Sequence, residues 1–129
     1  GTAETKETKM TRTDILNAMQ RVKGAPVLDD AVLAEAAEVV RRAFPSVPVL
    51  PQPALQSVED VLHLVDLALP GWSIQLTGKA TEPDGHWRCS LRETRGSDEI
   101  EIVGLGTGAA VAQALLEALL DVALQKVRR

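Results

Sequence analysis

The stretch Trp72–Val103, WSIQLTGKATEPDGHWRCSLRETRGSDEIEIV, decides the fold because apolar and polar residues alternate along it. A period of two is typical of strands that bury one face, so the stretch predicts three strands. Glu82–Gly85 predicts a turn between the first two strands, and Thr94–Ser97 predicts the second turn. The residues expected on the apolar face are Trp72, Ile74, Leu76, Trp87, Cys89, Leu91, Ile100 and Ile102.

The same alternation predicts the pairing of these strands in an antiparallel sheet. A slip by one residue would turn charged side chains onto the apolar face, so one register is favoured. The expected cross-strand pairs are Leu91–Ile100, Cys89–Ile102 and Arg92–Glu99. The polar face, exposed to water or to a partner, is expected to carry Ser73, Gln75, Thr77, Arg88, Ser90, Arg92 and Glu101.

Four segments around the strands have the apolar spacing of helices. Two fall within residues 13–44, with Thr13 and Asp29 as the expected N-caps. A third begins after Ser57 and ends before Pro70-Gly71. The last is expected to start near Thr107 and to run to about residue 127.

These elements predict an α+β fold, in which a three-stranded antiparallel sheet carries helices on one face in the order α-β-β-β-α, preceded by two N-terminal helices. The expected organisation is a flexible tail (1–12), a helical segment (13–44), a connector (45–56) and the α-β-β-β-α domain (57–129). The connector holds four of the seven prolines, which favours an extended and stiff chain.

Composition excludes several classes of protein. The chain has 129 residues, 45% of them hydrophobic and 25% charged, as in ordinary globular domains. Its single cysteine rules out an internal disulfide framework. A net charge of −4 argues against a nucleic-acid partner, because phosphates attract basic surfaces. Neither a membrane-spanning run nor a secretory signal is recognisable, so we expect a cytoplasmic protein.

The last helix is apolar around most of its circumference. Its polar residues Gln113, Glu117 and Asp121 follow one another at every fourth position, and nearly all others are Ala, Leu or Val. A helix of this kind is buried on most sides. Either the N-terminal helices cover it, or a second copy does so in a homo-oligomer. In the second case the contact surface is expected at Leu116, Leu120 and Leu124.

Two motifs suggest chemistry, and each has a simpler interpretation. Gly104–Ala109 fits the dinucleotide pattern G-x-G-x-x-G/A, but no later strand completes a βαβ unit, so a strand-to-helix turn is expected. An anion site at that helix start stays open. His86 and Cys89 would face opposite sides of a strand, and His63 is distant. We therefore expect no catalytic residues, no cofactor, no metal and no enzymatic activity.

Two resemblances bear on the fold. The order α-β-β-β-α, with Pro83-Asp84-Gly85-His86 in the first hairpin loop, is similar to that of double-stranded RNA-binding domains. The lysines with which that family contacts phosphate would align with Ala109, Ala110 and Gln113, so the resemblance implies topology without RNA binding.

Residues 57–125 also resemble the phage ABA sandwich, a small bacterial and phage-associated domain. The resemblance rests on Gly71-Trp72, on Trp87-x-Cys89-x-Leu91 and on Gly104-Leu105-Gly106-Thr107 before an Ala/Leu helix. It implies a bacterial or prophage origin and no known activity. The sequence thus predicts a protein that works by binding another protein or itself, with a degenerate nucleic-acid-binding domain as the alternative. Its expected surface includes Gln75, Arg88 and Arg92.

Overall fold

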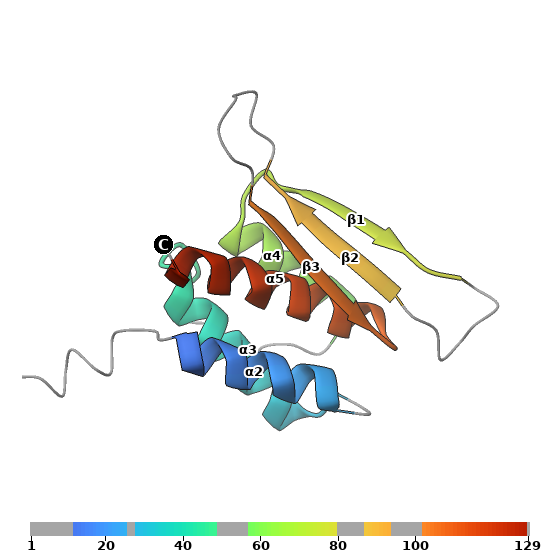
Figure 1. Ribbon diagram of the computed structural model, residues 1–129, viewed down its shortest axis with the longest axis horizontal. Helices are drawn as coiled ribbons and strands as arrows, with labels where there is room; N and C mark the ends of the chain where they lie inside the picture. Colours follow the sequence, from blue (N-terminus) through green and yellow to red (C-terminus); the bar gives the residue numbers. More distant parts are fainter. Residues whose placement is uncertain (1–11, 26–27, 49–56, 80–86, 94–101, 129) are drawn as a thin grey trace, which may run out of the picture.

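The computed structural model describes residues 12–25, 28–48, 57–79, 87–93 and 102–128 and has the predicted α+β fold (Figure 1). A three-stranded antiparallel sheet in the order β1-β2-β3 packs on a C-terminal helix, and the described residues include three helices before the sheet. The elements are α2 (Arg12–Gly24), α3 (Asp30–Ala43), α4 (Val58–Ala68), β1 (Ser73–Thr77), β2 (Trp87–Arg92), β3 (Val103–Gly108) and α5 (Val111–Arg128).

Side-chain caps fix the starts of two helices as the sequence predicts. The Asp29 carboxylate accepts a hydrogen bond from the Val32 N–H at 2.9 Å, and the Ser57 hydroxyl accepts one from the Asp60 N–H at 3.2 Å. Each bond satisfies a backbone donor that has no partner inside its helix. The predicted cap at Thr13 is wrong, because α2 already includes Arg12 and Thr13 lies within the helix.

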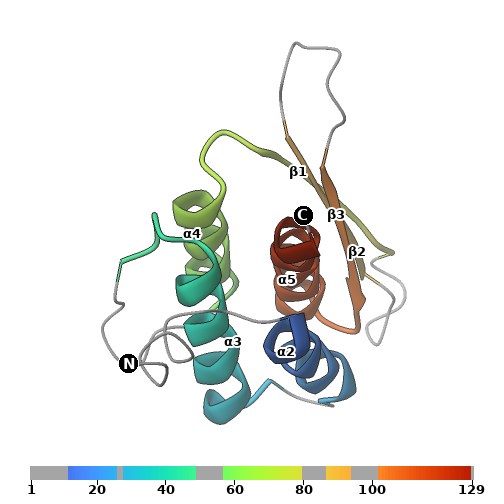
Figure 2. The ribbon, with the colours of Figure 1, turned by 60° about the vertical axis from the view of Figure 1, so that its left-hand side comes forward.

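The helices form a layered stack on one side of the sheet (Figure 2). α5 lies directly against β3 and β2, and α2, α3 and α4 pack on α5. We expected α4 on the sheet as well, but it packs mainly against α5. Buried residues of all four helices and of β2 belong to a single hydrophobic core. The N-terminal helices α2 and α3 therefore share one core with α4, β2 and α5, which follow the connector in the sequence.

The predicted pairing of the third strand is wrong. Leu91 lies opposite Gly104 and Cys89 opposite Gly106, whereas the sequence analysis placed Ile100 and Ile102 there. In the register of β2 and β3, Arg92 lies opposite Val103, where the sequence analysis placed Glu99. Residues 94–101, with Glu99 and Ile100, lie outside the described residues. The residues of the third strand that pair with β2 lie four positions later in the chain than predicted. Because four is an even number, the same residues of β2 face the core as predicted.

Close packing of α5 explains why a glycine-rich segment forms this strand. A Cβ added to Gly104 would lie 2.5 Å from the Ala118 carbonyl oxygen, and one on Gly106 would lie 2.5 Å from the Ala118 nitrogen. Real Cβ atoms do not approach backbone atoms this closely, so β3 can touch the helix only without side chains on that face. The predicted turn over Gly104–Ala109 is therefore wrong, and α5 begins at Val111 rather than near Thr107.

Polar side chains of α5 bind the outer edge of β3. The Leu105 N–H donates to Asp121 Oδ2 at 2.9 Å, and the Thr107 N–H donates to Glu117 Oε1 at 3.3 Å. Gln125 Nε2 donates to the Val103 carbonyl at 2.8 Å. The polar residues on the otherwise apolar α5 thus occupy backbone groups that an edge strand would leave open.

The N-terminal helices cover the remaining surface of α5. Gln113 Nε2 donates to the carbonyls of Val22 and Ala25, which ties the end of α2 to α5. Leu116 and Leu120 are fully buried, and Leu124 is 8% exposed. The hypothesis of an uncovered contact surface at these three leucines is therefore wrong. Of the two explanations for this apolar helix, coverage by its own chain is confirmed.

Candidate binding surface

The outer face of the sheet is the surface turned away from the helices (Figure 2). Alternation along the strands places every second residue on it, and directly opposed residues of neighbouring strands share a face. Most of its side chains are exposed, whereas Cys89 and Leu91 on the other face are buried against the core. The face consists of Ser73, Gln75, Thr77, Arg88, Ser90, Arg92, Val103, Leu105 and Thr107.

One exposed apolar side chain lies on this face, on the edge strand β3, next to two arginines of β2. Leu105 is 61% exposed, the highest value among the large hydrophobic residues that the structure describes. It pairs with Ser90, so Arg88 and Arg92 are its diagonal neighbours on β2. Diagonal neighbours in an antiparallel pair lie about 7–8 Å apart, within reach of long side chains. Leu105 therefore has a guanidinium-bearing side chain on either side.

Among the described strand residues, the only charges on this face are positive, whereas the chain as a whole is acidic. The three strands contain two arginines and no Asp or Glu, although the full chain carries a net charge of −4. Hydroxyl groups of Ser73, Thr77 and Thr107 add hydrogen-bond donors on the same face. The face is thus suited to a ligand that brings carboxylates together with an apolar group.

Sequence analysis identified part of this surface and missed its exposed apolar residue, Leu105. The expected residues Gln75, Arg88 and Arg92 are exposed and share the outer face, as the alternation predicted. Leu105 was missed because residues 104–107 were assigned to a turn. The period of two in Gly104-Leu105-Gly106-Thr107-Gly108 is the signal that could have revealed it, since glycines alternate there with larger residues.

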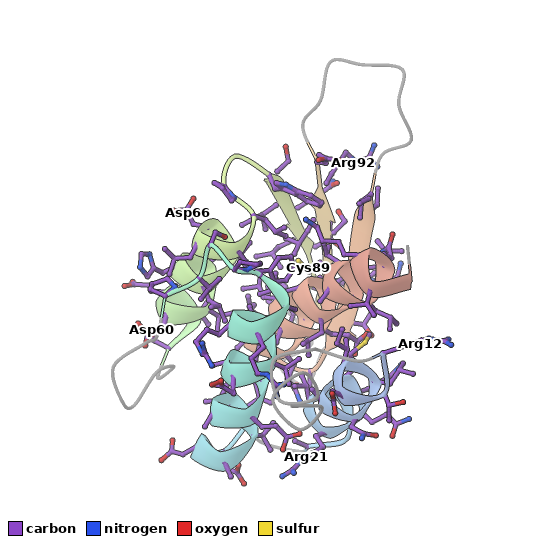
Figure 3. All side chains as sticks on the ribbon, turned by 90° about the vertical axis from the view of Figure 1, so that its left-hand side faces the viewer. Arg12, Arg21, Asp60, Asp66, Cys89 and Arg92 are labelled. Atoms are coloured by element: carbon purple, nitrogen blue, oxygen red, sulfur yellow. The ribbon has the colours of Figure 1, made fainter. Side chains whose placement is uncertain are left out.

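The candidate nucleophile Cys89 is buried in β2, and the candidate ligand His63 lies on a different element, α4. Cys89 is 2% exposed and lies in the packed interior (Figure 3), where burial raises the pKa of its thiol to about 11. A thiol kept neutral in this way is a poor nucleophile. His63 is exposed on α4, and His86 lies outside the described residues. Within the described part of the chain, no three His, Cys, Asp or Glu side chains are grouped to hold a metal ion.

The glycine motif is unsuited to phosphate in this arrangement. Carboxylates already accept from the Leu105 and Thr107 N–H groups, and the Gln113 side chain accepts from the Ala110 N–H at 3.1 Å. Glu117 is also 8% exposed, and its second oxygen, Oε2, is buried without a hydrogen-bond partner. A phosphate at this place would meet carboxylates rather than free backbone donors.

Comparison of the chain with protein-family models, with curated proteins and with solved structures finds no match. Among the described residues, none of the helices is long and apolar enough to span a membrane.

Proposed function

We propose that this chain is a non-enzymatic binding protein, and that the outer face of its sheet binds a protein segment in which acidic residues flank an apolar one. The observation that carries the proposal is Leu105, which is exposed on the outer face with the exposed Arg88 as a diagonal neighbour. An apolar anchor surrounded by charged groups is a common arrangement in protein interfaces. A carboxylate of the partner would meet the Arg88 guanidinium group while its apolar side chain covers Leu105.

A protein partner is favoured over nucleic acid by the position of the aromatic residues. Sheet faces that bind single strands stack bases on exposed aromatic rings. Trp72 and Trp87 instead pack against the hydrophobic core. At the start of α5, the residues aligned with the phosphate-binding lysines of double-stranded RNA-binding domains are uncharged, namely Ala109, Ala110 and Gln113. A degenerate nucleic-acid-binding domain therefore stays the alternative for the test to address.

The test is a titration of the isotope-labelled chain, followed by amide NMR shifts, with three probes. The first is a peptide with a central Leu between glutamates, the second the same peptide with lysines, and the third a duplex RNA. We expect only the acidic peptide to bind, with shifts concentrated at residues 88–92 and 103–107. Raising the salt concentration should weaken the binding, because the attraction is between exposed charges.

Variants then distinguish specific binding at the outer face from non-specific attraction between charges. Arg88→Glu should weaken the acidic peptide about tenfold, and Leu105→Ala should do so by a similar factor through lost apolar contact. The matched control is Arg12→Glu, which makes the same change of charge on α2, away from the sheet (Figure 3). Equal loss in the control, or binding of RNA in place of the acidic peptide, would overturn the proposal.

A further inference from the structure

The two edges of the sheet differ in how their backbone groups are used. Along β3, Val103, Leu105 and Thr107 direct backbone groups away from β2 and onto α5 side chains. The intervening residues of β3 therefore bond to Trp87, Cys89 and Leu91. The alternate residues of β2 then bond to Ser73, Gln75 and Thr77 of β1. By the same alternation, the backbone groups of Ile74 and Leu76 point outward from the free edge of β1.

This outer edge of β1 lacks the cap that protects β3. No hydrogen bond between described residues uses the outward backbone groups of Ile74 or Leu76. The strand, SIQLT, contains no charged residue and no proline, the usual features that prevent edge-to-edge pairing. Ile74 is 39% exposed although it lies on the same side of the sheet as α5, because β1 extends past the helix.

We infer that the β1 edges of two copies of this chain pair antiparallel about a two-fold axis at Gln75, forming a continuous six-stranded sheet. The inference does not rest on the proposed function. Ile74 of one copy would lie opposite Leu76 of the other, and both outward residues would exchange their backbone hydrogen bonds. Their apolar side chains would then pack together, which shields the exposed part of Ile74.

A second copy fits this edge because, in the antiparallel pair, each residue of β1 would face a residue of similar character. Under the two-fold axis, apolar residues meet apolar ones, Gln75 meets Gln75, and Ser73 meets Thr77. Charge does not oppose the pairing. Arg88 of one copy and Arg92 of the other would be separated by three strand spacings, about 14 Å, which exceeds the Debye length of about 8 Å in physiological salt. An isologous contact of this type also closes on itself and cannot extend into a fibre through the same edge.

The decisive experiment is a cysteine crosslink at the two-fold axis. Gln75 directs its own backbone groups toward β2, so the Gln75–Gln75 pair would be non-hydrogen-bonded, with Cα atoms about 4.5 Å apart. This separation permits a disulfide. Gln75→Cys should therefore form a covalent dimer on mild oxidation. Thr77→Cys is the matched control on the same strand and face, because its two copies would be about 14 Å apart.

A second measurement follows the native association without a crosslink. Sedimentation velocity from about 10 µM to about 1 mM should show a concentration-dependent dimer of modest affinity, since one short strand buries less than a standard interface. Ile74→Lys should abolish the dimer and leave the melting temperature nearly unchanged. Val127→Lys, at a residue of similar exposure (38%) on α5, should leave the dimer intact.

Three results would overturn the inference. A wild-type chain that stays monomeric up to about 1 mM has no such dimer. Equal crosslinking of Gln75→Cys and Thr77→Cys would indicate random collision. A dimer that survives Ile74→Lys would use another surface. The buried Cys89 does not confuse the comparison, because both variants retain it and its thiol pKa is raised to about 11.

Discussion

Replacing Gly106 with alanine tests whether this glycine-rich segment is a strand packed on α5. The added Cβ would lie 2.5 Å from the Ala118 nitrogen and 3.0 Å from the Glu117 Cβ. Gly106 is paired with β2, and Ala118 lies within α5, so neither side can yield as a flexible side chain could. We therefore expect the helix and the strand to be forced apart.

The magnitude follows from two opposing effects. Overpacking of this kind costs about 1–3 kcal/mol, and contact with backbone atoms places it near the upper end. Alanine also restricts the backbone of the unfolded chain, which stabilises the folded state by about 0.4–1 kcal/mol. A net loss of about 2 kcal/mol should lower the melting temperature by roughly 6–10 °C for a chain of this length.

The assay is thermal and urea unfolding followed by circular dichroism. The matched control is Gly24→Ala, the same substitution at the end of α2, where an added Cβ has no atom within 4 Å. The control should keep or slightly raise the stability. If Gly106→Ala melts at or above the wild-type temperature, the close packing of β3 on α5 is refuted.

Two further predictions concern the capped edge and the buried thiol. Asp121→Ala removes the acceptor of the Leu105 N–H and of Gln125 Nε2, so urea unfolding should show a loss of about 1–3 kcal/mol. The exposed Asp66 on α4 serves as control, and an equal loss in Asp66→Ala would contradict the role of the cap. Burial raises the Cys89 thiol pKa from 9.0 to about 11, so the stability that depends on the neutral thiol is present below pH 9 and is lost as the pH rises through 11. Alkylation at about pH 8 should therefore be slow until the protein unfolds, and rapid labelling of the folded chain would contradict this burial.

Local patterns were sufficient to predict most of the elements. The caps at Asp29 and Ser57 depend on hydrogen bonds to residues three positions ahead, which the sequence displays directly. The faces of β1 and β2 follow from alternation, so the exposure of Gln75, Arg88 and Arg92 could be predicted without knowing any distant contact. These features depend only on neighbours along the chain.

The third strand was missed because two neighbouring segments both alternate, and the choice between them depends on a distant helix. Ile100 and Ile102 alternate with charged residues and imitate an edge strand, whereas Gly104–Gly108 resembles a turn. Only the approach of Ala118 makes glycine the required residue in the strand. The same packing places Leu105 on the outer face and thereby creates the proposed binding surface.

The sequence by itself determined the fold class, the helix caps at Asp29 and Ser57 and the two faces of the first hairpin, since spacing and capping act over a few residues. The tertiary structure alone decided which segment completes the sheet, what covers the apolar C-terminal helix and which sheet edge stays open. Those outcomes depend on contacts between residues far apart in the chain, such as Gln113 with Val22 and Asp121 with Leu105.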